Sequence, residues 1–134
     1  MSKHLEGRAK ELLQAKNFAH VAVPRSDGTI QTAVVWVDAD DDGRIVLNSA
    51  EGRDWPRHLR RAGRATVSVH NQDDPYEYVT IVGEIDADTH EDGDAVIDAL
   101  AKKYLNADSY PGRTPDEQRV TFRLTPERVV HKGG

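Results

Sequence analysis

The densest group of side chains able to do chemistry in this 134-residue chain is a run of arginines that follows an Asn-Ser pair. Five arginines stand within twelve residues: Arg53, Arg57, Arg60, Arg61 and Arg64. The pattern predicts a strand ending at Asn48 and Ser49, then a helix over 53–62. The first turn of a helix has unpaired N–H groups and positive potential, which suit a phosphate. The segment therefore predicts a phosphate site, although taken alone it also fits a solvated helix face.

The charge of the whole chain favours the phosphate interpretation. The sequence has 18 Lys and Arg against 23 Asp and Glu, a formal net charge of −5, so an acidic protein has gathered its arginines in one place. The same net charge argues against general binding of nucleic acid, because a polyanion must be met by excess cations. The arginine run also lacks interleaved aromatic residues of stacking type. We expect a small-molecule partner and no nucleic acid.

Other kinds of site are disfavoured by the residue types. The chain has no cysteine, which excludes a disulfide framework, a thiolate metal site and a thiol nucleophile. Its six histidines show no metal-ligand spacing. The acidic turn 38–43 matches the first half of a calcium-binding loop, but Ser49 stands where that loop needs a glutamate, and strands flank the turn. We expect no metal.

Nothing in the sequence indicates a membrane segment. The longest apolar run, at 33–37, is far too short to cross a bilayer. The N-terminal residues lead into a charged amphipathic stretch without the apolar core of a signal peptide. With the absence of cysteine, this leads us to expect a cytoplasmic protein.

The elements that must position the arginine run can be read from periodicity. Helices are expected at 3–16, 53–62 and 91–105, with Asp54 as the N-cap of the second and Pro56 in its first turn. Six strands are expected, at 18–24, 30–37, 44–48, 65–70, 76–86 and 119–125, with a short edge strand at 128–131. Asp27-Gly28 predicts a hairpin turn, and 106–118 a long loop. The pattern predicts one α+β domain, residues 1–134, built on a small antiparallel barrel.

Several segments together resemble the pyridoxamine 5'-phosphate oxidase-like superfamily, and within it the flavin or deazaflavin oxidoreductases that use coenzyme F420. Residues 57–61, Arg-His-Leu-Arg-Arg, are similar to the family's Arg-Asn-Leu-Arg-Arg. Residues 75–78, Pro-Tyr-Glu-Tyr, are similar to its Asn-Pro-Tyr-x-Tyr stretch. The order of the expected elements agrees over nearly the whole chain. One departure is Trp55, which stands where many relatives carry a lysine.

The resemblance implies a six-stranded antiparallel split β-barrel that forms a homodimer and holds its cofactor between protomers. The phosphate would meet Ser49, Arg53, Trp55 and Arg57, and the strand 31–36 would lie along the ring, with Tyr76 and Tyr78 nearby. The full set of implied cofactor-binding residues is Gln31, Val34, Val35, Trp36, Asn48, Ser49, Arg53, Trp55, Arg57, Arg61, Tyr76 and Tyr78.

The implied function is an F420H2-dependent reductase that transfers a hydride to a small unsaturated substrate. The cofactor does this chemistry, so the sequence needs no catalytic triad. Tyr76, Tyr78 or a bound water would supply a proton, unless the tyrosines only pack at an interface. Arg60, Arg61 and Arg64 would form a track for the polyglutamate tail of F420. The alternatives are an FMN-dependent oxidase or reductase, and a non-catalytic protein that binds a flavin, a deazaflavin or a heme-type ligand.

Overall fold

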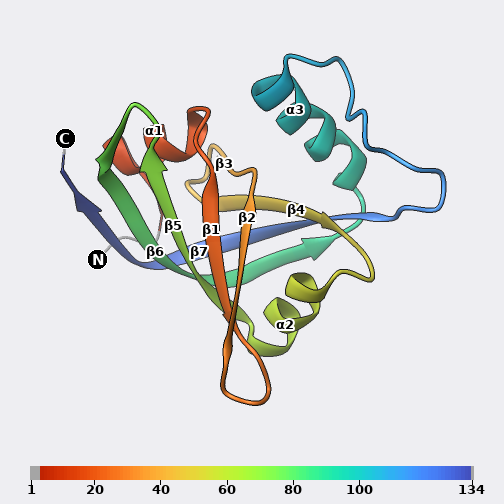
Figure 1. Ribbon diagram of the computed structural model, residues 1–134, viewed down its shortest axis with the longest axis horizontal. Helices are drawn as coiled ribbons and strands as arrows, with labels where there is room; N and C mark the ends of the chain where they lie inside the picture. The colour runs from red at the N-terminus through yellow and green to blue at the C-terminus, as the bar shows by residue number, and fades with distance from the viewer. Residues whose placement is uncertain (1–3, 134) are drawn as a thin grey trace.

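A curled antiparallel sheet of seven strands carries three helices in the computed structural model, which describes residues 4–133 (Figure 1). In chain order the elements are α1 (Gly7–Gln14), β1 (Ala19–Pro24), β2 (Ile30–Val35), β3 (Asp38–Ala39), β4 (Ile45–Ala50), α2 (Asp54–Ala62), β5 (Arg64–Asn71), β6 (Asp74–Thr89), α3 (Gly93–Leu105) and β7 (Arg119–Lys132). Helices α1 and α2 lie at opposite ends of the sheet, and α3 lies beside β4 and β7 (Figure 1).

The order of strands in the sheet is β2-β1-β5-β6-β7-β4-β3. The long strands β6 and β7 hold it together, because β6 pairs with both β5 and β7, while the first half of β7 also pairs with β4. The β6–β7 register shifts between Val82 and Gly83. A Cβ at Gly83 would lie 3.0 Å from the Cβ of Leu124, so the bend in β6 leaves little room for a side chain there.

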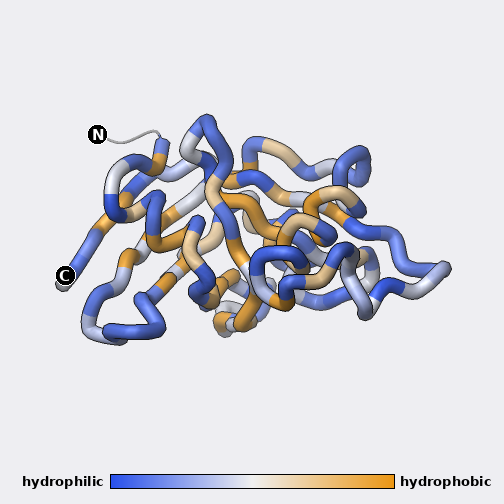
Figure 2. The backbone as a smooth tube through the Cα atoms, turned by 90° about the horizontal axis from the view of Figure 1, so that it is seen from above, coloured by the Kyte–Doolittle hydropathy of each residue, from blue (hydrophilic) through white to orange (hydrophobic). Residues whose placement is uncertain are grey.

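The core follows the alternation of the strands. Side chains on the concave face are fully buried, among them Val21, Leu47, Val67, Ile81 and Phe122. Figure 2 shows apolar residues concentrated toward the middle of the molecule and polar residues along the peripheral loops. A second, smaller apolar cluster forms where α3 covers the outer face of the sheet. This second cluster borders the candidate site.

The structure agrees with the α+β prediction and with the predicted hairpin, in which Gly28 has a φ of 90° between β1 and β2. It has seven strands where six were expected, because the two-residue β3 pairs with β4. The expected strands at 119–125 and 128–131 form one strand, β7, which continues through Pro126. The first helix is shorter than predicted, and residue 3, where that prediction began, lies outside the described residues. None of the three helices has the length and apolar composition needed to span a membrane.

Candidate functional site

The start of α2 is open to an anion. Gly52, with a φ of 92°, turns the chain after β4, and α2 begins at Asp54. The prediction of Asp54 as the N-cap was wrong: Arg53 holds that position and no side chain caps the helix. Because no side chain caps the helix and Pro56 has no N–H of its own, the unpaired N–H groups of the first turn are those of Asp54 and Trp55. Uncapped N–H groups at a helix start are what a phosphate binds.

A hollow of about 460 Å³ lies against this helix start. We call it the α2 pocket; its lining residues are Glu51, Gly52, Arg53, Pro56, Arg57 and Arg60. The side chain of Arg53 is 53% exposed and that of Arg57 is 70% exposed. Their contacts within the chain are weak, since Nη2 of Arg53 is 3.6 Å from Glu117 and Nη2 of Arg57 donates to the exposed Asp54 at 3.2 Å. Both guanidinium groups are therefore able to turn toward a ligand.

A second hollow, of about 210 Å³, lies under α3, and we call it the α3 pocket. Its lining residues are Val34, Val35, Trp36, Asn48, Arg53, Ile97, Leu100, Tyr110 and Arg119. The structure thus brings together five of the predicted cofactor-binding residues, from the end of β2, from β4 and from the turn before α2. Arg53 lines both pockets, so the two hollows adjoin at its side chain.

The aromatic wall of the α3 pocket is fixed by polar contacts behind it. Trp36 stacks on Tyr104, with ring centroids 5.1 Å apart and planes 4° apart, and Tyr110 meets Trp36 edge-on at 6.0 Å. The Tyr104 hydroxyl accepts a hydrogen bond from the Val37 N–H at 3.1 Å and donates to the Asn17 carbonyl. Burial raises the pKa of Tyr104 to about 12, so its hydroxyl stays protonated.

Lys103 ties α3 to the rest of the fold beside this wall. Its ammonium donates to the carbonyls of Leu13 at 2.9 Å and Val37 at 2.5 Å, and burial lowers its pKa to about 8. The position of α3 over the pocket is therefore held by contacts that leave its Ile97 and Leu100 face free to line the hollow.

Arg119 is a site residue that the sequence analysis missed. It is only 5% exposed, and its Nε donates to Asn48 Oδ1 at 3.0 Å while Nη1 donates to Glu117 at 3.0 Å. Its guanidinium lies 5.1 Å from the centre of the Tyr110 ring. The sequence shows only that Arg119 alternates with inward-facing residues of the last strand. That α3 covers this outer face depends on tertiary packing, which periodicity does not reveal.

Six predicted residues line neither pocket, namely Gln31, Ser49, Trp55, Arg61, Tyr76 and Tyr78. Trp55 packs in the core with its ring centroid 6.0 Å from that of Phe122, and it does not line the α2 pocket. Ser49 is buried on the same face of β4 as Ile45 and Leu47, and its hydroxyl has no hydrogen-bond partner. The side-chain oxygen of Gln31 is also buried without a partner.

The remaining arginines of the run are engaged within the chain. Arg60 makes two hydrogen bonds of 2.7 Å to Glu51 and also binds Asp88, and hydrogen bonds from Arg60 and His90 lower the pKa of Glu51 to about 2. Arg61 donates to the Pro24 carbonyl at 2.7 Å, and Arg64 pairs with Glu127. The expected basic track of Arg60, Arg61 and Arg64 is therefore occupied by partners from the same chain.

Tyr76 and Tyr78 lie at the other end of the sheet. Arg64, which follows α2, pairs with Glu84 of β6, and Tyr76 stands eight residues before Glu84 on that strand. Eight residues of strand span about 26 Å. Figure 1 shows the same separation, with the start of β6 beside α1 and α2 at the opposite end. Neither tyrosine is among the residues that line the α2 or the α3 pocket.

The acidic turn before β4 is organised by its own side chains. Asp40 accepts hydrogen bonds from the N–H groups of Asp42 at 3.0 Å and Arg44 at 2.9 Å, and the Arg44 side chain pairs with Asp40 and Asp86. Between residues 4 and 133, no group of three or more His, Asp or Glu side chains is arranged to hold a metal ion.

Comparisons with known proteins agree on a fold and a family. Residues 5–133 match the family described as pyridoxamine 5'-phosphate oxidase. The solved structure of an F420 reductase matches with a TM-score of 0.80 and 22% identity, covering 94% of this chain and 98% of its own. A conserved hypothetical protein from Mycobacterium tuberculosis matches with a TM-score of 0.71 and 17% identity, covering 98% and 88%. HupZ from Group A Streptococcus matches with a TM-score of 0.69 and 14% identity, covering 97% and 99%. No curated protein matches the chain.

Proposed function

Because the chain belongs to the pyridoxamine 5'-phosphate oxidase family, we propose that it binds a phosphorylated flavin-type cofactor across the α2 and α3 pockets and acts as an oxidoreductase. The cofactor we propose is F420, and the reaction is hydride transfer to a small unsaturated substrate. The observation that carries this proposal is the position of Arg53, which lines a hollow suited to a phosphate and a hollow suited to a ring.

The α2 pocket suits a phosphate by the chemistry of its donors. It combines the uncapped start of α2 with the exposed guanidinium groups of Arg53 and Arg57. A charge-assisted hydrogen bond to a phosphate contributes about 1.5–3 kcal/mol. Trp55 is buried where many relatives carry a lysine, so the two arginines bear more of the phosphate binding than in those relatives.

The α3 pocket suits a planar ring by its shape and lining. Val34, Val35, Ile97 and Leu100 offer apolar surface, and Trp36 and Tyr110 offer aromatic faces and edges. Apolar walls with a few fixed polar groups are typical of cofactor sites. A ring attached to a phosphate in the α2 pocket would extend past Arg53 along the end of β2.

We also propose a homodimer. Ile30 and Val34 on the edge strand β2, and Tyr76 and Tyr78 on β6, are exposed in the single chain. Neither tyrosine lines the α2 or the α3 pocket of its own chain, so in this proposal they meet a cofactor that is bound by a second copy. Tyr76, Tyr78 or a water then supplies the proton that accompanies hydride transfer.

In this proposal the cofactor does the redox chemistry and the protein binds and positions it. The cofactor, when bound, supplies the hydride. Arg53 and Arg57 hold its phosphate, and the apolar lining of the α3 pocket excludes water from the face of the ring. The stacked pair of Trp36 and Tyr104 keeps that lining in place.

An FMN-dependent oxidase or reductase is the second candidate. F420 carries a polyglutamate tail beyond its phosphate, whereas FMN ends at the phosphate. Arg60 and Arg64, two of the residues expected to bind that tail, are paired with Glu51, Asp88 and Glu127. This pairing removes much of the sequence argument for a tail site and favours FMN, while the match to an F420 reductase supports the deazaflavin.

Titration of the purified protein with F420 and with FMN tests the proposal. We expect micromolar or tighter binding of one of them, and a loss of about 3–6 kcal/mol, or 100-fold or more, in the double variant Arg53→Ala, Arg57→Ala. The matched control is Lys102→Ala, Arg128→Ala, which removes two exposed positive charges outside both pockets. Unchanged binding in the first double variant would place the phosphate elsewhere. A cofactor that binds in reduced form but is oxidised by no acceptor would indicate a ligand-binding protein.

A further inference from the structure

We propose that Arg119 selects a cofactor ring that carries an anionic oxygen, and that Glu117 is the anion that pairs with Arg119 in the ligand-free protein. This inference rests on the proposed function, because it concerns the ring end of the same ligand. It assigns a role to a residue that neither the sequence motifs nor the family match single out.

The first observation is that Arg119 presents a buried guanidinium to a pocket. Its Nε and Nη1 are held by Asn48 and Glu117, while Nη2 hydrogen-bonds to none of the residues that the structure describes. The amide of Asn48 is fixed in turn, because it donates to the Gly93 carbonyl at 2.9 Å and to Thr121 at 3.2 Å. The guanidinium is thus held in one orientation, and its Nη2 can still donate a hydrogen bond to a ligand.

The second observation is that the lining of the α3 pocket has positive charges and no negative charge. Two of the nine residues that line the α3 pocket, Arg53 and Arg119, are cationic and none is anionic. Both pair with the same carboxylate, since the Glu117 oxygens lie 3.0 Å from Nη1 of Arg119 and 3.6 Å from Nη2 of Arg53. Asp94 and Asp98 on α3 are paired with Arg113. Glu117 is therefore the carboxylate that pairs with both of the guanidinium groups that line the α3 pocket.

The third observation is the burial of the Arg119–Glu117 pair. Arg119 is buried and the side chain of Glu117 is only 11% exposed, and six of the nine residues that line the α3 pocket are apolar or aromatic. A buried cation needs a paired anion to offset its desolvation. In such surroundings an anionic ring oxygen can pair with Arg119 directly, and Glu117 can then neutralise Arg53 alone.

Ring chemistry makes this a criterion for the choice of cofactor. A deazaflavin ring with a hydroxyl group ionises to an anion that is delocalised over the ring, whereas the oxidised FMN ring is uncharged. The two ligands can carry the same phosphate. Arg119 would thus distinguish the rings, while Arg53 and Arg57 bind both phosphates alike.

The test compares two ligands that differ only in the ring: 8-hydroxy-5-deazariboflavin 5'-phosphate and FMN. Each is titrated into the full-length protein, and the absorption of the deazaflavin reports whether its hydroxyl is ionised. We expect at least about 10-fold tighter binding of the deazaflavin phosphate, and a lower pKa of its hydroxyl when bound. Arg119→Gln should abolish both effects and leave FMN binding within about 3-fold, whereas Arg119→Lys should retain part of the preference.

A second variant tests the same inference if Arg119→Gln does not fold. Glu117→Gln removes the competing carboxylate and should tighten binding of the deazaflavin phosphate further. Asp116→Asn is the matched control, because it removes the same charge from the neighbouring exposed residue and should change nothing. Equal binding of both ligands, with an unshifted hydroxyl pKa and no effect of Glu117→Gln, would overturn this inference and leave the proposed function standing. Failure of both ligands to bind the wild-type protein would overturn both.

Discussion

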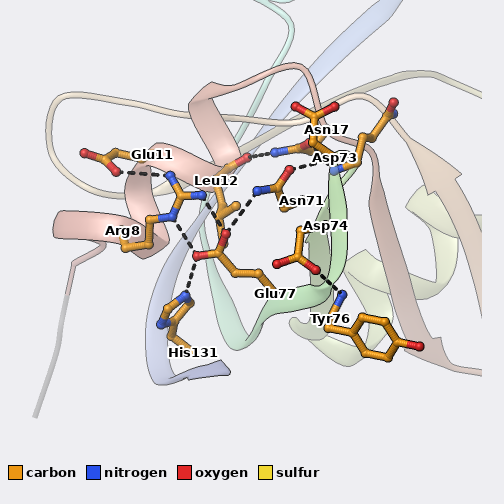
Figure 3. Close-up of polar contacts among 11 residues, drawn as sticks. Arg8, Glu11, Leu12, Asn17, Asn71, Asp73, Asp74, Tyr76, Glu77 and His131 are labelled. Carbon is orange, nitrogen blue, oxygen red and sulfur yellow. Dashed lines mark hydrogen bonds and ion pairs between the residues drawn. The ribbon is translucent and has the colours of Figure 1, made fainter. Parts of the chain in front are cut away.

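Two hollows of nearly the same size lie at opposite ends of the molecule. The charged groups beside them differ in how fully they are paired within the chain. The α2 pocket has a volume of about 460 Å³. The other hollow, of about 450 Å³, lies between α1 and the β5–β6 turn. It adjoins a group of residues that we call the Glu77 cluster, namely Glu77, Arg8, Asn71 and His131 (Figure 3). Size alone does not distinguish the two hollows.

In the Glu77 cluster the other three residues all hydrogen-bond to the Glu77 carboxylate. Glu77 is only 3% exposed and accepts hydrogen bonds from Arg8 at 2.7 and 2.6 Å and from Asn71 at 3.1 Å, with His131 at 2.9 Å. Asn71 also accepts from the N–H of Asp73, and Asn17 beside it bridges Leu12 and Gln72. Figure 3 shows these contacts joining α1, the β5–β6 turn and the end of β7.

In the α2 and α3 pockets the polar groups are left partly unsatisfied. Arg53 and Arg119 share one carboxylate, Arg57 has only an exposed neighbour, and the start of α2 has no side-chain cap. Buried polar clusters with complete hydrogen bonding stabilise a fold, whereas spare donors at a cavity are available to a ligand. The contrast fits a structural role for the Glu77 cluster and supports the proposal that the α2 and α3 pockets bind a ligand.

The largest expected effect comes from breaking the Glu77 cluster. Glu77→Gln removes the charge that Arg8 and His131 face, and we expect the midpoint of thermal unfolding to fall by on the order of 10 °C. Glu11→Gln is the matched control, since Glu11 is an exposed partner of the same arginine at 3.4 Å and should change the midpoint little. Equal midpoints for the two variants would show that the cluster is not structural.

Acid should weaken the same cluster. Hydrogen bonds from Arg8, Asn71 and His131 hold the pKa of Glu77 well below its ordinary value of 4.5. The unfolded chain therefore binds a proton at this carboxyl at a higher pH than the folded chain does. The free energy of unfolding should fall as the pH drops below the ordinary pKa of 4.5. Urea unfolding at about pH 7 and about pH 3.5 should show a larger loss for the wild type than for Glu77→Gln. The same loss in both proteins would assign the acid sensitivity to other groups.

The smallest expected effect concerns Ser49. Its buried hydroxyl has no hydrogen-bond partner, so Ser49→Ala should raise the free energy of unfolding by about 0.5–1 kcal/mol and leave cofactor affinity unchanged. Thr121→Val is the opposite control, because the Thr121 hydroxyl accepts a hydrogen bond from Asn48 and its loss should be destabilising. A clear loss of cofactor affinity in Ser49→Ala would restore Ser49 as a phosphate ligand.

Local sequence signals predicted most of the fold. Alternation of apolar residues marked the strands, the Asp-Gly pair marked the first hairpin, and helical spacing marked all three helices. The two-residue β3 was missed because so short a strand carries no periodicity. The continuity of β7 was missed because Pro126 interrupts the pattern, although a proline can occupy a strand position where its N–H is not needed.

The site was only partly predictable, since its composition depends on which side chains tertiary packing turns inward. Spacing placed Arg53 and Arg57 at a helix start, where the structure has them. Arg60, Arg61 and Arg64 were expected to form a track for the tail of F420, but Arg60 and Arg64 pair with Asp88 and Glu127 from distant parts of the chain. Arg119 became visible as a site residue only once α3 was placed over the outer face of the sheet.

A crystal structure of the protein with bound FMN would test the central claim most directly. The account predicts that the phosphate lies at the start of α2, within hydrogen-bond distance of the guanidinium groups of Arg53 and Arg57, with the ring extending into the α3 pocket. A phosphate bound beside the Glu77 cluster, or anywhere away from both arginines, would contradict it.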